Sequence, residues 1–169
     1  MQNTLVRPAG EQDLLLVKML AEKIWPLTYS GILTGTQIGY MLNRIYSPDS
    51  LKQQMQEYHH HFLILEQEGK PAGFASYSLH PDEKKGKLQK IYIDTVLQGK
   101  GLGKFLLEYV VVHVKAADCL ILQLDVNRQN KARLFYEKLG FVITGVKDTA
   151  IGNGFFMHDY VMERKLDDR

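Results

Sequence analysis

Three glycines at every second position give the clearest chemical signal in this chain. The stretch LQGKGLGKFLLE contains alternating glycines, two lysines and then an apolar run: Gly99, Lys100, Gly101, Gly103 and Lys104. Glycine lets the backbone approach a ligand closely and adopt positive φ, which we expect at Gly101 and Gly103. The free N–H groups and the dipole at the start of the following helix favour an anion. We therefore predict a backbone cradle for a diphosphate rather than a flexible basic turn.

The two commonest phosphate motifs do not fit this stretch. The nucleoside-triphosphate loop requires glycine where Gln98 stands and a hydroxyl where Phe105 stands. The dinucleotide pattern requires a third glycine where Lys104 or Leu106 stands. What remains is a Gln-x-x-Gly-x-Gly pattern between a strand and a helix.

Composition restricts the class of protein. The net charge of +2 is too small to indicate nucleic-acid binding by overall electrostatics. The single cysteine, Cys119, excludes an intramolecular disulfide and a cysteine-rich zinc site, as is typical of a reducing compartment. No apolar run approaches the roughly 20 residues that span a bilayer, and the N-terminal residues lack an export core. We expect a soluble cytoplasmic protein without nucleic-acid or membrane partners.

Hydrophobic patterns and breakers indicate the order of secondary structure. We expect helices at residues 11–25, where Pro26 ends the helix, at 36–46, from Ser47-Pro48 onward, at 105–116, and at 130–139 before Gly140. We expect strands at residues 3–9, on either side of a turn at 68–70, at 85–94, at 119–126 as a central strand covered on both faces, and at 141–146 and 155–166. This order predicts one domain over residues 1–169. Its class is α+β, with three α/β/α layers: a single mixed, largely antiparallel sheet with helices on both faces.

Two ordered motifs resemble those of the GNAT superfamily of N-acetyltransferases. The first is IYIDTVLQGKGLGKFLLE, in which Gln98, Gly101 and Gly103 fill the family signature. The second is LDVNRQNKARLFYEKLGF, which carries Asn127, Asn130, Tyr136, Gly140 and Phe141. The predicted element order is also similar to that family over nearly the whole chain, and implies the GNAT fold. The resemblance implies acetyl-CoA as cofactor, with its pyrophosphate on Gln98, Gly99, Lys100, Gly101, Leu102, Gly103 and Lys104.

A looser resemblance concerns the branch within the superfamily. The segments WPLTYSGILTGTQIGYMLNRIYS and GNGFFMHDYVMERKL are similar to the branch related to spermidine/spermine acetyltransferases. Such relatives often carry two acidic residues where this chain has His158-Asp159. This departure puts a polycationic substrate in doubt.

The resemblance also implies roles for residues near a thioester. The main-chain groups of Ile91, Tyr92 and Ile93 pair with the extended pantetheine, whether or not their side chains fill the core. The N–H near Ile93 stabilises the developing charge on the carbonyl oxygen. Tyr136, a residue type that more often packs in the core, is expected to give a proton to the leaving sulfur.

Other assignments keep alternatives open. Asp94 or His80 is a candidate base for the acceptor amine, or a solvated residue at a strand end. Asn130 contacts the cofactor, caps its helix, or does both, and Lys138 is a candidate for the 3′-phosphate. Trp25, Tyr29 and Asp159 are candidates for the acceptor pocket, with Tyr40 and Tyr46 as further aromatic walls. The consecutive histidines His59, His60 and His61 point to opposite faces of a strand, so we expect no metal site.

The sequence therefore predicts an acetyl-CoA-dependent N-acetyltransferase acting on a small primary amine. The alternative is a catalytically silent acyl-CoA-binding sensor. Polyamines, amino acids or peptides, and antibiotic amines all remain open as acceptors, and a homodimer is compatible with the sequence.

Overall fold

A computed structural model describes residues 3–166. The chain divides into two compact units. Unit 1 comprises the described residues up to Ser78 together with Gln89–Val110, and unit 2 comprises Leu79–Leu88 and the described residues from Val111 onward. The single domain expected from the sequence stays a prediction.

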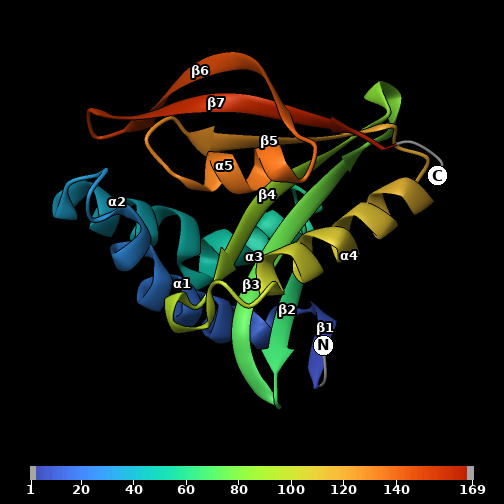
Figure 1. Ribbon diagram of the computed structural model, residues 1–169. Coiled ribbons are helices and arrows are strands. Elements are labelled where there is room, and N and C mark those ends of the chain that lie inside the picture. Colours follow the sequence, from blue (N-terminus) through green and yellow to red (C-terminus); the bar gives the residue numbers. More distant parts are fainter. Residues whose placement is uncertain (1–2, 167–169) are drawn as a thin grey trace. The chain divides into compact units, whose positions relative to one another are not determined.

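Seven strands and five α-helices are connected by short turns in the described part of the chain (Figure 1). The strands are β1 (Thr4–Ala9), β2 (His61–Gln67), β3 (Lys70–His80), β4 (Lys85–Ile93), β5 (Ile121–Asn127), β6 (Val142–Gly152) and β7 (Phe155–Lys165). The α-helices are α1 (Leu14–Tyr29), α2 (Gly35–Tyr46), α3 (Pro48–Gln56), α4 (Leu102–Ala116) and α5 (Ala132–Lys138). Three 3-10 turns, η1 (Glu11–Asp13), η2 (Pro81–Glu83) and η3 (Thr95–Leu97), complete the order.

The strands follow the order β1-β2-β3-β4-β5-β7-β6 in a mixed sheet. β4 and β5 run parallel, whereas β1 with β2, β2 with β3, β5 with β7 and β6 with β7 are antiparallel. This arrangement confirms the α+β class with a mixed, largely antiparallel sheet.

In unit 1, helices α1, α2 and α3 pack against one another. β2 and β3 each contain consecutive buried residues, so both faces of these strands are covered. The largest fully buried side chains of this unit are Ile24, Tyr46, Leu51, Ile64, Leu65, Phe74, Leu106 and Leu107. Ser47 caps α3: its hydroxyl accepts the Ser50 N–H at 3.2 Å, and Pro48 takes the first helical position.

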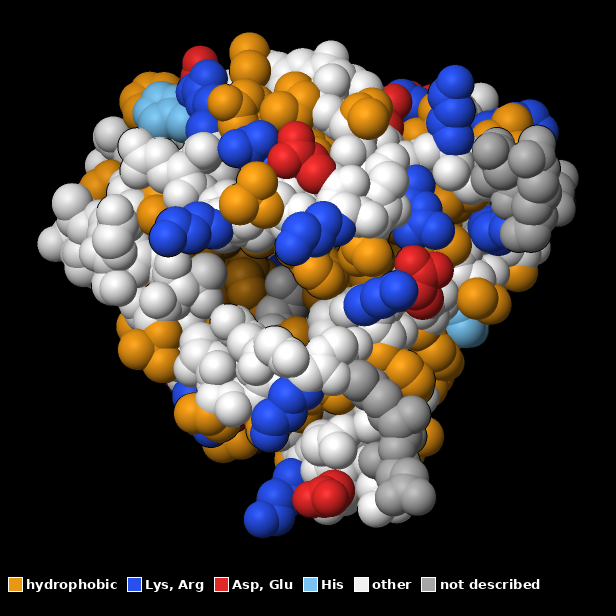
Figure 2. Space-filling model, viewed as in Figure 1, with side chains coloured by type: hydrophobic (Ala, Val, Ile, Leu, Met, Phe, Trp, Pro, Cys, Tyr) orange, Lys and Arg blue, Asp and Glu red, His pale blue; other side chains and the backbone are white. Residues whose placement is uncertain are grey.

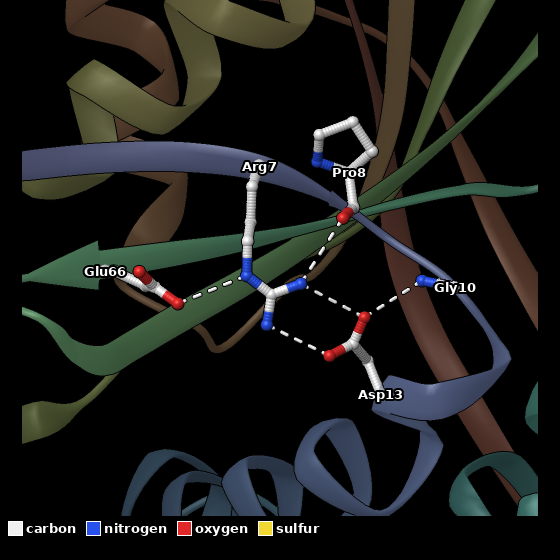
Figure 3. Close-up of polar contacts among 5 residues, drawn as sticks. All are labelled: Arg7, Pro8, Gly10, Asp13 and Glu66. Atoms are coloured by element: carbon white, nitrogen blue, oxygen red, sulfur yellow. Dashed lines mark hydrogen bonds and ion pairs between the residues drawn. The ribbon is translucent and has the colours of Figure 1, made fainter.

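Arg7 ties the first strand to its neighbours (Figure 3). Its guanidinium donates to both carboxylate oxygens of Asp13, at 2.9 and 3.1 Å, and to Glu66 on β2 at 3.1 Å. Asp13 also accepts the Gly10 N–H at 3.0 Å, which closes the turn that begins α1. The Arg7 hydrogen bonds hold the pKa of Asp13 below its usual range. The paired charges therefore orient the start of α1 on the sheet.

Three helix boundaries and one strand end differ from the sequence prediction. The helix expected from residue 11 opens with the 3-10 turn η1, so α1 begins at Leu14. Strand β6 continues to Gly152 rather than ending at residue 146. Pro26 does not end α1, which continues to Tyr29 with the proline inside it. The last turn is held because Trp25 and Tyr29 are buried and the Ser30 N–H bonds the Pro26 carbonyl at 3.1 Å. α4 begins at Leu102 rather than residue 105, so it starts directly at the glycines.

Unit 2 consists of β5, β7 and β6 with α5 and the neighbouring parts of β3, β4 and α4. Leu122, Leu124 and Val126 of β5 are buried, whereas Ile121, Gln123 and Asp125 are only half-buried. The expected cover on both faces of β5 is therefore complete on the apolar face and partial on the other, which carries Ile121, Gln123 and Asp125. The fully buried large side chains are Leu122, Leu124, Phe141 and Met162.

Two observations bear on possible partners, one from the surface and one from the helices. Lysine and arginine side chains on the face drawn in Figure 2 stand apart from one another, separated by uncharged and acidic groups. Among residues 3–166, every helix falls short of the length and apolar character needed to cross a bilayer.

One lysine of unit 1 has an unusual environment. The Lys90 ammonium donates to Gln54 Oε1 at 2.6 Å and lies 5.5 and 5.9 Å from the ring centres of Phe62 and Tyr46. Burial lowers the pKa of Lys90 from 10.5 to about 8. The charged form is therefore less favourable in the folded state than in the unfolded chain.

We expect Lys90→Met to stabilise the protein at neutral pH. Because the folded pKa is depressed, the cost of charging Lys90 is full below about pH 8 and disappears as pH rises through 10.5. The shift corresponds to roughly 3 kcal/mol, an upper bound because the substitution also removes the Gln54 bond. Urea unfolding at pH 7 and at about pH 9.5 measures the change, with Lys18→Met as the exposed control. A stability difference that does not shrink with rising pH would contradict the assignment.

Candidate functional site

The glycine loop, residues 98–104, comprises the turn between η3 and α4 and the first residues of α4. Gly99 and Gly101 adopt φ of +81° and +79°, the left-handed region that favours glycine. Gly103 lies in the first turn of α4, so the positive φ expected there was wrong and belongs to Gly99 instead. The Phe105 N–H bonds the Gly101 carbonyl at 3.1 Å and closes the first helical turn. The N–H groups that open α4 have no acceptor within the helix, as at every helix start, and Lys100 and Lys104 are exposed beside them.

Gln98 fixes the beginning of the loop with its side chain. Its Nε2 donates to the Ile93 carbonyl at 3.2 Å, and its own N–H contacts the Thr95 carbonyl at 3.4 Å. The side chain therefore bridges the turn from the end of β4 to the glycines.

Asp94 stands at the junction of β4 and η3. Its Oδ1 accepts the Val96 N–H at 3.2 Å, and its Oδ2 accepts from the Lys23 ammonium of α1 at 2.6 Å. The Lys23 hydrogen bond holds the pKa of Asp94 below its usual range, despite burial. A carboxylate with these two donors and a lowered pKa is a poor proton acceptor at neutral pH. The contacts therefore disfavour Asp94 as the base and make it the cap of η3.

Ile91, Tyr92 and Ile93 end strand β4. The pairs between β4 and β5 run from Lys85↔Ile121 to Leu88↔Leu124, so these three residues lie past the last pair. Ile93 is buried. On the other side, the backbone of Gly73 in β3 lies close to β4. A Cβ added to Gly73 would be only 2.4 Å from the Tyr92 carbonyl oxygen. Core packing by side chains and pairing by main-chain groups are therefore compatible here.

Three of the aromatic candidates of unit 1, Trp25, Tyr29 and Tyr46, form one cluster with Tyr92. The fourth, Tyr40, accepts a hydrogen bond from Arg44 at 2.9 Å. Trp25 and Tyr29 are buried, and their rings lie 5.8 and 6.5 Å from the ring of Tyr92. The hydroxyl groups of Tyr29 and Tyr92 are 2.9 Å apart, and Trp25 Nε1 donates to the Tyr46 hydroxyl at 3.2 Å. Much of this aromatic surface is used in packing, while the paired hydroxyls tie α1 to the end of β4.

The second motif lies in unit 2. Asn130 Oδ1 accepts the Ala132 N–H at 2.9 Å, which holds the turn just before α5, whose N-cap position is Lys131. Asn127 is buried, and its Oδ1 accepts the Gln129 N–H at 2.9 Å. Tyr136 is 8% exposed, and its ring lies 5.7 Å from that of Phe141. Lys138 is exposed in the last turn of α5.

Asp159 of β7 is a buried carboxyl group in a charged surrounding. It pairs with Asn127 on β5 and Lys147 on β6, and it is 8% exposed. Burial, followed by the charge of Asp125, raises its pKa to about 6 in spite of Lys147, Arg128 and Lys87. Asp125 itself contacts the ammonium groups of Lys87 and Lys147 at 3.2 and 3.1 Å. Asp159 therefore titrates close to neutral pH.

Of the three consecutive histidines, only His61 lies in a strand, because β2 begins there and His59 and His60 precede it. The ring of His61 stacks on Tyr77 with a centroid distance of 4.9 Å, and His60 lies 6.1 Å from Tyr58. Across the described residues 3–166, no three histidine, cysteine, aspartate or glutamate side chains group as metal ligands.

Sequence reasoning missed the role of Lys23. Its partner Asp94 is 71 residues away, so no local pattern signals the pair. The role of Asn127 was also missed, although its position just before a turn is a typical signal for such a side-chain bond.

The sequence model for the acetyltransferase (GNAT) domain matches residues 32–164. This chain belongs to the GNAT acetyltransferase family. The matched segment contains the glycine loop, Asn130, Tyr136 and Asp159. Lys23, Trp25 and Tyr29 precede it.

Other proteins of known name are similar to this GNAT chain. A spermine/spermidine N(1)-acetyltransferase of Bacillus subtilis is 36% identical over 89 residues, covering 48% of this chain and 59% of that protein. A mycothiol acetyltransferase of Streptomyces coelicolor is 34% identical over 82 residues, covering 48% of this chain and 26% of that protein. The chain therefore spans less than two thirds of the length of these relatives.

Solved structures share the fold over almost the full length. A PaiA N-acetyltransferase from Thermoplasma acidophilum, in complex with coenzyme A, has a TM-score of 0.80 and 26% identity, covering 96% of this chain and 98% of that one. A GCN5-related N-acetyltransferase from Rhodopseudomonas palustris has a TM-score of 0.81 and 22% identity over 98% of both chains, which shows the fold alone.

We expect Asp159→Asn to stabilise the GNAT chain above pH 6 and to lose that advantage in acid. The pKa of Asp159 is raised, so the folded state takes up its proton near pH 6. The cost of the charged form is therefore full above about pH 6, shrinks as pH falls through 5, and disappears near the ordinary value of 3.8. Chemical unfolding of both proteins at about pH 8 and pH 5 gives the comparison. An NMR titration that places the Asp159 carboxyl pKa near 4 would refute it.

Proposed function

We propose that this chain is an acetyl-CoA-dependent N-acetyltransferase that acts on a primary amine. The observation that carries the proposal is the glycine loop, in which two left-handed glycines lead directly into the start of α4. Backbone amides in this arrangement suit a diphosphate, and neither glycine places a Cβ over them. Family membership and the CoA-bound Thermoplasma structure support the same cofactor.

The residues of unit 1 would hold the cofactor along the end of β4. The amides of the glycine loop bind the pyrophosphate, with Lys100 and Lys104 adding positive charge. The main-chain groups of Ile91, Tyr92 and Ile93 pair with the pantetheine amides, which suits their place past the last β4–β5 pair. The Ile93 N–H orients the carbonyl oxygen of the acetyl group.

Bound acetyl-CoA supplies an acetyl group activated as a thioester. In unit 2, Tyr136 Oη holds the proton for the leaving sulfur, because an ordinary phenol stays protonated at neutral pH. Asn130 keeps the start of α5 in place through its bond to the Ala132 N–H. Lys138 is the candidate for the 3′-phosphate, and its exposure leaves it free to move toward one.

The acceptor amine must lose a proton, which passes to water, before its nitrogen attacks the acetyl carbonyl, since an alkylamine resembles lysine in its pKa. Asp159 anchors a cationic group of the acceptor other than the attacking nitrogen, because a buried carboxyl with a pKa of about 6 is mostly charged at neutral pH and gains from a cationic partner. In unit 1, Trp25 and Tyr29 stay candidates for apolar contact with the acceptor. The named Bacillus relative supports a polyamine, whereas three basic residues around Asp159 favour an acceptor with fewer charges.

The alternative is an acyl-CoA sensor that binds the cofactor without turnover. Both functions need the glycine loop, and only the enzyme needs Tyr136. The two are therefore separated by amine-dependent release of the CoA thiol.

We expect Gly101→Ala to weaken CoA binding at least about tenfold, because the alanine resists the left-handed backbone and displaces the amides. Gly69→Ala is the matched control, since Gly69 has nearly the same φ of +77° in the β2–β3 turn. Both variants should lose on the order of 1 kcal/mol of stability. Calorimetric titration with CoA gives the affinities. Equal CoA affinity in the two variants would exclude the loop as the diphosphate site.

We expect Tyr136→Phe to bind CoA as the wild type does and to lower kcat roughly 100-fold, because only the hydroxyl proton is removed. Thiol release from acetyl-CoA is measured with spermidine, an amino-acid amide and an aminoglycoside as acceptors. Phe135→Leu is the neighbouring control. Unchanged kcat in Tyr136→Phe would remove the tyrosine as the acid. CoA binding without thiol release for any amine favours the sensor.

A further inference from the structure

Helix α1 makes a charged contact with the turn that leads into the glycine loop. The Lys23 ammonium lies 2.6 Å from Asp94 Oδ2. The lysine side chain is 59% exposed, whereas the aspartate side chain is 6% exposed. A nearly buried carboxylate thus forms an ion pair with a lysine on a helix that carries no part of the loop.

Asp94 connects three parts of unit 1. Its backbone N–H donates to the Ala72 carbonyl of β3 at 2.8 Å, and its carbonyl accepts the Leu97 N–H at 2.8 Å. Its carboxylate accepts the Val96 N–H and the Lys23 ammonium. The residue therefore fixes η3 against both β3 and α1.

The hydrogen bonds at Asp94 are followed directly along the chain by those that fix the glycine loop. Gln98 is the next residue after η3, and its side chain bonds back to the Ile93 carbonyl at 3.2 Å. Gly99 and Gly101 follow at once in their left-handed conformations. A shift of η3 would therefore move the amides of the glycine loop.

Charge balance explains why Lys23 matters to this turn. A carboxylate that is almost buried is costly unless it is paired and hydrogen-bonded. The Lys23 hydrogen bond is the largest influence that lowers the pKa of Asp94. Without the lysine, the Asp94 carboxylate would be drawn toward water, away from the Val96 N–H.

We propose that Lys23 is a positioning residue for the cofactor: through Asp94 it holds the glycine loop in its binding conformation. This inference rests on the proposed function, since it assumes that the loop binds CoA. Lys23 acts through Asp94 and not by touching a phosphate. A direct phosphate contact is the competing explanation, because the ammonium is partly exposed.

The test compares Lys23→Met, Asp94→Asn and the double variant. Lys23→Arg is the conservative variant. Lys18→Met is the matched control, because Lys18 forms an exposed ion pair with Glu22 at 3.1 Å on the same helix. CoA affinity, KM for acetyl-CoA, kcat and thermal unfolding are measured for each protein at low and high salt.

We expect Lys23→Met to weaken CoA binding roughly fivefold, the effect of losing one partly exposed ion pair. KM for acetyl-CoA should rise by the same factor, while kcat stays unchanged. Lys23→Arg should restore most of the affinity, and Lys18→Met should match the wild type. The double variant should bind no worse than Asp94→Asn, because both substitutions break the same link.

Two results would overturn the proposal. One is a folded Lys23→Met protein with wild-type CoA affinity. The other is a double variant whose loss is the product of the two single losses, which would indicate a direct phosphate contact.

Hydrogen exchange of the ligand-free proteins separates this proposal from the proposed function. We expect faster exchange at the amides of residues 96–105 in Lys23→Met than in the wild type or Lys18→Met. Equal exchange rates would also refute the positioning role. Failure of the wild type to bind CoA, with the exchange effect intact, would refute the cofactor assignment alone.

Discussion

A carboxylate that is nearly removed from water must find charged and hydrogen-bonding partners, and Asp94 meets this requirement with Lys23 and the Val96 N–H. This requirement affects the positions of neighbouring elements as well as the ion pair itself. It requires α1 to lie against the end of β4, and it sets where η3 begins. The glycine loop that follows inherits its position from this turn. Asp13, another nearly buried carboxylate, is paired in the same way with Arg7 at the other end of α1 (Figure 3).

Helix α1 therefore serves both the core and the candidate site of unit 1. Its buried side chains, Ile24 and Trp25 among them, supply apolar packing. Its polar contacts lie on either side of Ile93, since Tyr29 reaches the hydroxyl of Tyr92 and Lys23 reaches Asp94. The same helix thus holds both neighbours of the residue whose N–H we propose to orient the acetyl group.

Electrostatic surroundings give three ionisable groups different properties. Asp94 and Asp159 are both buried carboxyl groups, yet the first has a lowered pKa and the second a raised one. The difference arises because Lys23 touches Asp94 directly, whereas the cations near Asp159 act at longer range and Asp125 opposes them. Lys90 loses its proton more easily than an ordinary lysine, because desolvation of the buried ammonium outweighs its hydrogen bond to Gln54. The residue type alone would not distinguish these cases.

The sequence by itself predicted the features that depend on residues close together in the chain, such as helix starts and ends. Ser47-Pro48 starts α3, Gly140 follows α5 with φ of +93°, and alternating glycines precede a helix. The two GNAT motifs could likewise be read from sequence because each is contiguous. Pro26 shows the limit, since burial of Trp25 and Tyr29 carries α1 past it. Only the tertiary structure decided that Asp94 forms an ion pair with Lys23 and that Lys90 is desolvated. It also decided that Asp159 lies opposite Asn127 and Lys147 on the neighbouring strands. These properties depend on residues distant in sequence, and the energy of a charge is set by what the fold brings beside it.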